Sequence, residues 1–348
     1  RAHNGPSVQA IVKTRPGPGF DVRDVPEPQR GDGEVLLKVL SASICGSDVH
    51  LYDWSPWVAS RVNPPRIIGH ELCGEVVTGG KGTDGLASGT RVAVESHIIC
   101  GHCPECRRGE SHVCAATKIL GVDTDGGFTS FVSVPAKNVW PVEQALPPEV
   151  AAAMEPFGNA VHACSYGSLR GATVLILGCG FIGCACVAIV KAEGATQIIA
   201  ADLNPYRLEL ARRLGADTLV NVDATPLEDA VRRSAAAAVD CALEMSGAPE
   251  SVVGATKLVR AGGWISLLGL SNRPATLNVS DDIVMKGLTL HGVIGRRLPE
   301  SWQKADAYIR SGSIDLAALI THRFPLEGID EAMQLMKSGE CGKVALTV

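Results

Sequence analysis

The sequence predicts an α/β protein with two domains, a β-rich domain followed by a domain built on a doubly wound parallel sheet. Its length of 348 residues favours two domains. Residues 1–154 are rich in glycine, proline and short β-branched runs, whereas strand-like and helix-like runs alternate from Thr173 onward. Such alternation is typical of βαβ units, which form parallel sheets.

The β-rich domain is predicted from runs bounded by turn residues, with strands at Val35–Leu40, Gly74–Val77 and Thr90–Val94. The segment Glu149–Tyr166 then has the composition of a helix and leads into the second domain. We therefore expect the change of architecture near Leu146–Pro148.

The second domain is predicted element by element from the alternating pattern. Strands are expected at Thr173–Leu177, Gln197–Ala201, Thr218–Asn221, Asp240–Glu244 and Trp264–Leu268. Helices are expected at Gly180–Glu193, Pro205–Leu214 and Pro249–Val259. Beyond Gly295 we expect helices at Ser301–Ser311 and Gly328–Ser338 and a strand at Lys343–Val348.

Composition excludes several classes of protein. The net charge of -5 gives no reason to expect binding to nucleic acid or to an anionic membrane. No apolar run reaches the roughly 18 residues that span a bilayer, and Arg1–Val8 lacks the apolar segment of a secretory signal. We therefore expect a cytoplasmic protein whose 12 cysteines are reduced thiols and metal ligands.

A glycine-rich turn predicts a dinucleotide site. The run from Gly178 to Gly183 reads G-x-G-x-x-G between a predicted strand and a predicted helix, where glycines allow a tight turn, a close approach to pyrophosphate and close packing of the helix. Gly178, Gly180, Ile182 and Gly183 are the predicted contacts.

Two side chains after the second strand extend this prediction. Asp202 ends that strand, where a carboxylate binds the ribose hydroxyls of NAD and repels the 2′-phosphate of NADP. The alternative for Asp202 is a helix N-cap. Arg207 is predicted near the adenosine end, with a solvated helix face as an equal alternative.

Four cysteines form the most specific local pattern. Cys100, Cys103, Cys106 and Cys114 lie within fifteen residues, with glycine and proline between them. Such spacing lets four thiolates surround one tetrahedral Zn²⁺, and four protein ligands leave no open position. We therefore predict a structural zinc site.

A second possible metal set is dispersed, and spacing alone is a weak argument for it. It consists of Cys45, His70, Glu71 and Glu155. The stretches around these residues resemble those of the zinc-containing medium-chain alcohol dehydrogenases, in the same order and over nearly the whole chain. The stretches carrying the likeness are Cys45–Trp54, Pro64–Glu71, Glu95–Gly101, Lys118–Gly126 and Glu155–Val161. They are most similar to the branch of that family that oxidises L-threonine.

The resemblance implies a GroES-like catalytic domain (1–154 and 297–348) and a Rossmann NAD-binding domain (155–296). It implies a catalytic zinc bound by Cys45, His70 and Glu71, with Glu155 as a nearby carboxylate that exchanges onto the metal or assists proton movement. It also implies a proton relay through Ser47 and His50. Further cofactor contacts are implied in two segments, namely Leu268, Gly269, Leu270, Val293 and Ile294.

The activity implied is NAD-dependent oxidation of a small-molecule alcohol, L-threonine to 2-amino-3-oxobutanoate, by a homotetramer. Ser47 stands where the threonine-oxidising branch usually has threonine. This difference, together with the stretch Gly126–Phe128, keeps open a dehydrogenase of a polyol, amino alcohol or aminocyclitol. A non-catalytic NAD- or zinc-binding protein on the same fold is the second alternative.

Overall fold

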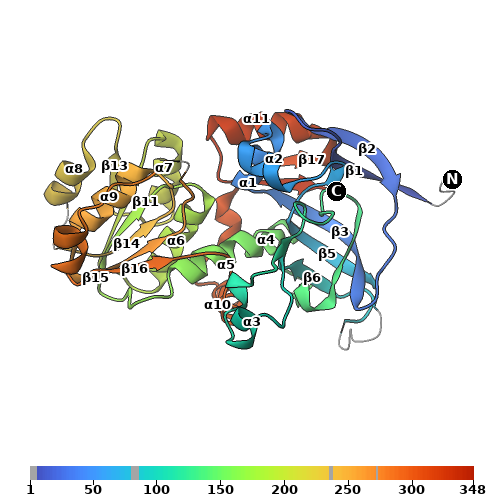
Figure 1. Ribbon diagram of the computed structural model, residues 1–348, viewed down its shortest axis with the longest axis horizontal. Coiled ribbons are helices and arrows are strands. Elements are labelled where there is room, and N and C mark those ends of the chain that lie inside the picture. Colours follow the sequence, from blue (N-terminus) through green and yellow to red (C-terminus); the bar gives the residue numbers. More distant parts are fainter. Residues whose placement is uncertain (1–5, 80–85, 235–237, 272) are drawn as a thin grey trace. The chain divides into compact units, whose positions relative to one another are not determined.

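The computed structural model describes residues 6–79, 86–234, 238–271 and 273–348, and its internal contacts divide it into two compact units (Figure 1). The first unit comprises Arg1–Pro156 and Ile320–Val348, and the second comprises Phe157–Leu319. No helix within the described ranges is long and apolar enough to cross a membrane.

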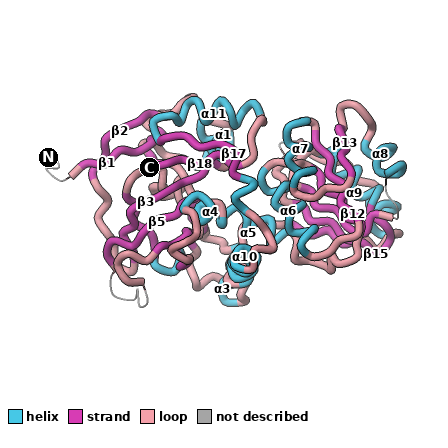
Figure 2. The backbone as a smooth tube through the Cα atoms, turned by 180° about the vertical axis from the view of Figure 1, so that it is seen from behind, coloured by secondary structure: helices cyan, strands magenta, loops and turns pink. Residues whose placement is uncertain are grey.

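The first unit is built on a seven-stranded sheet in the order β10-β6-β5-β3-β18-β17, with β9 also paired to β3. Figure 2 labels β3, β5, β17 and β18 of this sheet. Its strands are β3 (Glu34–Ile44), β5 (Glu71–Thr78), β6 (Arg91–Val94), β9 (Phe131–Pro135), β10 (Val139–Pro141), β17 (Ile320–Pro325) and β18 (Lys343–Thr347). A small sheet joins β1 (Ser7–Lys13), β2 (Asp21–Pro26) and β4 (Arg66–Ile67), and β7 (His97–Ile98) pairs with β8 (Lys118–Ile119). The β-rich architecture expected for this part of the chain is therefore present.

The C-terminal end of the chain completes this sheet. β18 pairs with β3 in antiparallel register, so that Val344 lies opposite Ile44, and β17 is parallel to β18. Apolar side chains of these strands, including Leu37, Leu72 and Val344, are buried in one core. This burial fixes the register, because a slip by one residue turns every side chain to the opposite face.

The predicted helix Glu149–Tyr166 is two helices, α4 (Pro148–Ala152) and α5 (Met154–Ala163). Pro156 explains the break, since it has no N–H to donate to the carbonyl of Ala152 in a continuous helix. In the observed structure Pro156 lies in the first turn of α5, where a missing donor costs little.

The second unit contains a six-stranded parallel sheet in the order β13-β12-β11-β14-β15-β16. Its strands are β11 (Thr173–Leu177), β12 (Gln197–Asp202), β13 (Thr218–Asn221), β14 (Val239–Glu244), β15 (Val259–Leu267) and β16 (Thr289–Gly292). The strand order reverses between β11 and β14, and this is where open α/β sheets bind ligands.

Helices join these strands, as the alternating pattern predicts. They are α6 (Phe181–Ala192), α7 (Pro205–Arg213), α8 (Leu227–Ser234) and α9 (Pro249–Leu258). α6 packs on β11, β12 and β14, and α9 packs on β14 and β15 (Figure 1). The sequence analysis did not predict α8 or the short edge strand β16.

Helix α10 (Glu300–Arg310) belongs to the second unit by its contacts. Lys304 Nζ lies 2.9 Å from a Glu193 carboxylate oxygen, the Tyr308 hydroxyl donates to the same carboxylate, and the Tyr308 ring packs against Phe157. By its contacts the second unit therefore ends at Leu319, and the chain returns to the first unit at Ile320. The sequence predicted this boundary between residues 296 and 297. Helix α11 (Ile329–Ser338) lies in the first unit.

Candidate active site

Three potential metal ligands meet in the first unit. The ligand atoms of Cys45, His70 and Glu71 lie within 4.8 Å of one another. Cys45 caps the N-terminus of α1 (Gly46–Asp53), and Glu71 begins β5. Because Ser43 of β3 lies opposite Glu71 in the ladder, the pairing of β3 with β5 brings the two sequence segments together.

Glycine is required beside His70. Gly69 has φ +94°, and a Cβ there would lie 2.1 Å from Phe128 Cδ1. Gly127 N–H donates to the Gly69 carbonyl at 2.9 Å. The stretch Gly126–Phe128 therefore packs against the turn that presents His70. This packing gives a structural reason for the glycines in the stretch.

The imidazole of His70 is held between two polar groups of α1. Its Nδ1 lies 3.7 Å from Asp48 Oδ1, and its Nε2 lies 3.5 Å from the Ser47 hydroxyl. Asp48 is fixed in turn by the Cys45 N–H, which donates to Oδ2 at 2.9 Å. A carboxylate behind one ring nitrogen is the usual arrangement for a metal-ligating histidine, because it orients the ring.

The charges of this cluster suit a bound cation. Burial opposes protonation of the His70 ring, but the Asp48 carboxylate and the Cys45 thiolate outweigh it and raise the pKa of His70 well above its usual value. Burial raises the pKa of Asp48 to about 6. His70 Nδ1 and Asp48 Oδ1 are buried without a hydrogen-bond partner within the described part of the chain. The cluster carries more negative than positive charge. A divalent ion beside Cys45 and His70 would balance this excess, so the donor set fits zinc.

The two glutamates of the predicted set differ in their surroundings. Both oxygens of the buried Glu71 contact the Lys343 ammonium, at 2.9 and 2.8 Å, and the Ser43 hydroxyl donates to one of them. Glu155 is also buried, accepts a hydrogen bond from Ser96, and lies close enough for its charge to raise the pKa values of His70 and Lys343. It is outside the group of ligand atoms within 4.8 Å.

The two residues predicted for the proton relay share one helix, and other side chains of this unit have contacts of their own. Ser47 and His50 both belong to α1, and His50 is exposed. His97 is partly buried and its backbone N–H donates to Glu95. Trp57 is exposed and lies beside the Arg61 guanidinium. Lys343 was missed by the sequence analysis, because only the pairing of β18 with β3 brings it here.

The four cysteines of the predicted structural site converge. The sulfurs of Cys100, Cys103, Cys106 and Cys114 all lie within 4.8 Å of one another. Cys114 Sγ is 3.6 Å from Cys100 Sγ and 3.8 Å from Cys103 Sγ, and four sulfurs at about 2.3 Å from a tetrahedral zinc would be about 3.8 Å apart.

Backbone donors support the thiolate form of these cysteines. The Cys100 N–H donates to Cys114 Sγ at 3.4 Å, and this bond, more than any other interaction, lowers the pKa of Cys114 to about 6. The Cys103 N–H donates to Cys100 Sγ in the same way. The loop therefore favours the thiolates of Cys100 and Cys114, whereas burial raises the pKa of Cys106 to about 12.

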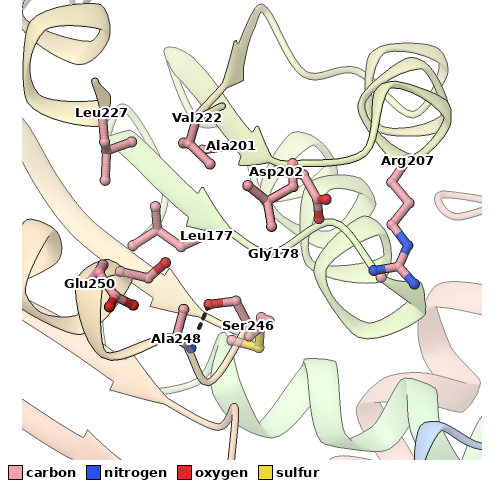
Figure 3. Close-up of a pocket in the computed structure, with 14 residues that line it drawn as sticks. Leu177, Gly178, Ala201, Asp202, Arg207, Val222, Leu227, Ser246, Ala248 and Glu250 are labelled. Atoms are coloured by element: carbon pink, nitrogen blue, oxygen red, sulfur yellow. Dashed lines mark hydrogen bonds between the residues drawn. The ribbon is translucent and has the colours of Figure 1, made fainter. Parts of the chain in front are cut away.

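The second unit contains a cavity of about 570 Å³ beside the glycine-rich turn (Figure 3). It lies at the ends of β11, β12 and β14, where the strand order reverses. Its lining includes Gly178, Gly180, Asp202, Leu203, Arg207, Val222, Leu227, Met245, Ser246, Ala248, Glu250 and Ser251.

The three motif glycines have different roles. Gly178 has φ +89°, and a Cβ on Gly183 would lie 1.8 Å from the Gly178 carbonyl oxygen, so the fold itself requires both. A Cβ on Gly180, in contrast, would meet no heavy atom within 4 Å. Gly180 is the N-cap of α6, so the space it leaves lies in front of free helix N–H groups. Ile182 lies in the first turn of this helix.

Asp202 and Arg207 both line the cavity (Figure 3). Asp202 accepts from the Cys179 N–H at 2.6 Å and from the Asn204 N–H at 2.8 Å, which ties it to the glycine-rich turn. Asn204, not Asp202, caps α7. Arg207 Nε is buried without a hydrogen-bond partner within the described ranges.

The remaining predicted cofactor contacts lie outside this cavity. The N–H groups of Leu268 and Gly269 donate to the Glu244 carbonyl, and Leu270 is 97% exposed. Val293 is buried and its N–H donates to the Leu267 carbonyl, whereas Ile294 is exposed. The lining residues of the segment 245–251 were not predicted, although their position directly after a predicted strand at the sheet's carboxyl edge was a usable signal.

Two family descriptions match the chain. The alcohol dehydrogenase GroES-like domain matches residues 31–144, and the zinc-binding dehydrogenase domain matches residues 182–311. The chain belongs to the zinc-binding alcohol dehydrogenase family, and it is an oxidoreductase with a GroES-like and a Rossmann domain.

Its similar proteins include L-threonine 3-dehydrogenases. That of Symbiobacterium thermophilum is 46% identical over 342 residues, which are 98% of this chain and 97% of the relative. That of Pyrococcus horikoshii is 43% identical over 341 residues, 96% and 97% of the two chains. Among solved structures, an Escherichia coli alcohol dehydrogenase complexed with NADH has a TM-score of 0.91 at 31% identity and covers 99% of this chain and 100% of its own.

Proposed function

We propose that this chain oxidises the 3-hydroxyl of L-threonine with NAD⁺, giving 2-amino-3-oxobutanoate, NADH and a proton. The observation that carries the reaction class is the cluster of half-buried Cys45 with buried His70 and Glu71, whose ligand atoms lie within 4.8 Å of one another. The full-length relatives named L-threonine 3-dehydrogenase supply the substrate.

The roles that we propose for individual residues are as follows. Cys45, His70 and Glu71 would hold the catalytic zinc, with Glu155 as a nearby carboxylate that exchanges onto it or assists proton movement. Cys100, Cys103, Cys106 and Cys114 would hold a structural zinc. Zinc lowers the pKa of a bound alcohol and NAD⁺ accepts hydride, so the protein supplies orientation and proton transfer. The Asp48 carboxylate, 3.7 Å from Nδ1, would orient the His70 ring when the metal is bound.

Proton movement is assigned to α1. The Ser47 hydroxyl lies 3.5 Å from His70 Nε2 and is therefore next to the metal ligands. His50 is three residues further along the same helix and is exposed, so it can exchange a proton with solvent. The hydroxyl at position 47 is retained although the family's usual threonine is not.

The adenosine half of the cofactor is assigned to the cavity of the second unit. The Gly178–Gly183 turn would hold the pyrophosphate, and Asp202 would accept from the ribose hydroxyls and disfavour NADP. Arg207, with a buried Nε, lies at the same end of the cavity. Leu268, Gly269, Leu270, Val293 and Ile294 are assigned to the nicotinamide half.

We further propose a cytoplasmic homotetramer. All 12 cysteines are free thiols, which suits a reducing compartment. The apolar side chains of Val279, Val284 and Met285, which precede the edge strand β16, are 56–78% exposed, and such side chains commonly mark subunit interfaces.

The experiment that tests the activity is NADH formation by the zinc-loaded protein with L-threonine, other β-hydroxy amino acids, polyols and amino alcohols. We expect a clear preference for L-threonine, NAD⁺ preferred over NADP⁺, and loss of turnover in Cys45→Ser. A preference for a polyol or amino alcohol would contradict the substrate. No turnover on any substrate, together with about one zinc per chain, would favour a non-catalytic binding protein.

A further inference from the structure

The C-terminal end of helix α5 holds the segment that leaves strand β16. His162 is 1% exposed, and its Nδ1 lies 2.9 Å from the Gly295 carbonyl oxygen. Its Nε2 lies 3.0 Å from the Tyr166 hydroxyl. Because a carbonyl only accepts, Nδ1 must carry the proton, and the neutral ring then accepts the Tyr166 proton at Nε2. The hydrogen bonds therefore fix one tautomer of His162.

Tyr166 extends this contact to both sides of Gly295. Its ring stacks on His291 of β16, with centroids 4.0 Å apart and planes inclined by 14°. The Arg297 guanidinium lies 5.6 Å from the centroid of the same ring. Burial and the charge of Arg297 lower the pKa of His291, which favours a neutral stacked pair. Positions 291, 295 and 297 are thus all held by His162 and Tyr166.

Helix α5 makes one more contact with this segment. The Asn159 side-chain oxygen, one turn before His162, accepts from Arg296 Nη1 at 3.2 Å. Gly158 provides the room, since a Cβ there would lie 2.7 Å from Arg296 Cγ. Arg296 itself is 3% exposed. The backbone between β16 and Arg297 therefore has little freedom to move relative to α5.

Val293 and Ile294 lie inside this held segment, just beyond the carboxyl end of β16, the edge at which parallel sheets bind ligands. We propose that His162 is a positioning residue that sets the backbone of residues 293–295 for the nicotinamide half of the cofactor. The proposal rests on the proposed function in one respect, namely that Val293 and Ile294 contact that half.

The test compares two ligands of the full, zinc-loaded chain by titration calorimetry. NADH carries both halves of the cofactor, whereas ADP-ribose lacks the nicotinamide. Leaving the partly buried Gly295 carbonyl without its donor in His162→Ala should weaken NADH binding about tenfold and change ADP-ribose binding less than about twofold. A residue that only stabilised the fold would weaken both ligands alike.

Three further variants make the result specific. His162→Asn keeps an N–H donor at the position of Nδ1 and should restore most of the NADH affinity. Tyr166→Phe keeps the ring stack but removes the bond to Nε2, so a smaller loss confined to NADH is expected. Tyr308→Phe removes a partly buried hydrogen bond elsewhere in the same unit and is the matched control.

Unchanged NADH binding in His162→Ala, equal losses for both ligands, or an equal NADH loss in Tyr308→Phe would each overturn the proposal. If His162→Ala fails to fold, the NADH and ADP-ribose affinities of Tyr166→Phe and His162→Asn are compared instead. No substrate is needed, so failure here is distinguishable from failure of the wild type to oxidise L-threonine.

Discussion

Glu71 shows how one residue combines a structural and a chemical requirement. It is fully buried, and both of its oxygens face the Lys343 ammonium, which is itself 3% exposed. Burial opposes the charge of Lys343, but the Glu71 carboxylate outweighs it and raises the pKa of Lys343. The pair places the Glu71 carboxylate beside Cys45 and His70. The Lys343 ammonium compensates the charge of this carboxylate even when Glu71 does not ligate the metal.

Lys343→Met should therefore be strongly destabilising. It leaves the buried Glu71 carboxylate without its ammonium partner, and breaking a buried ion pair in this way typically costs about 3–5 kcal/mol of unfolding free energy. The measurement is urea unfolding of the zinc-loaded protein. Lys337→Met is the matched control, because Lys337 pairs with Asp53 at 2.6 Å on the surface, where such pairs contribute less than about 1 kcal/mol. Equal losses in the two variants would refute this account of Glu71.

Individual site residues differ in how far sequence could predict them. Asp202 was predictable because its distance from the glycine turn is set within one βαβ unit. Cys45, His70, Glu71 and Glu155 depended on resemblance, and their metal roles stay predictions. Lys343 could not be found, since nothing local links a residue near the C-terminus to β3.

At the scale of elements, the cysteine loop is the least regular part of the first unit. Its helical piece, α3 (Pro104–Arg107), has four residues, none of them buried. A segment with so little apolar burial has few interactions of its own to hold it. We propose that an ion held by the converging sulfurs supplies that order.

Removing one sulfur should consequently remove one metal. We expect Cys106→Ser to lower the zinc content by about one ion per chain and to make the loop the first site of proteolysis. Zinc is measured by mass spectrometry and cleavage by limited trypsin digestion. Cys341→Ser, which changes a buried thiol outside both clusters, should leave zinc unchanged, and zinc loss in this control would argue against two separate sites.

The elements that sequence predicted well are strands and helices within the alternating pattern that follows Thr173. β11 and β13 have the bounds that their apolar runs indicated, and α6 follows its glycine turn. β16 was missed because its four residues, Thr289–Gly292, are partly exposed and not continuously apolar. Pro156 explains the break before α5 through the local rule for proline in helices. The composition of Glu149–Tyr166, taken alone, did not indicate this break.

For the whole molecule, family and fold class were predictable and are confirmed by the matched domains. Assembly is the property least accessible from either sequence or a single chain. Its best indication is the exposed apolar group formed by Val279, Val284 and Met285. Apolar side chains that water contacts in one chain are commonly covered in a symmetric oligomer.

Met285→Asp should therefore shift the protein toward smaller species. A charge in the centre of a subunit contact remains unpaired and desolvated, which weakens association. Light scattering after size exclusion measures the mass, and Val22→Asp, at another exposed apolar position (40%), is the control. An unchanged tetramer in Met285→Asp, or dissociation in both variants, would exclude this surface as the interface.

The glycines around His70 limit how this site can change during evolution. A Cβ on Gly121 or on Gly126 would lie 2.6 Å or 2.2 Å from the Gly69 carbonyl oxygen, and Gly69 in turn has Phe128 against its own Cα. Gly121 and Gly126 thus leave room for the Gly69 backbone, while Gly69 leaves room for the Phe128 ring. A larger residue at Gly121 cannot be compensated at Gly126, because each would press on the same backbone. Drift in metal affinity or substrate preference must therefore proceed through residues such as Ser47, which change the pocket while this backbone contact is inherited intact.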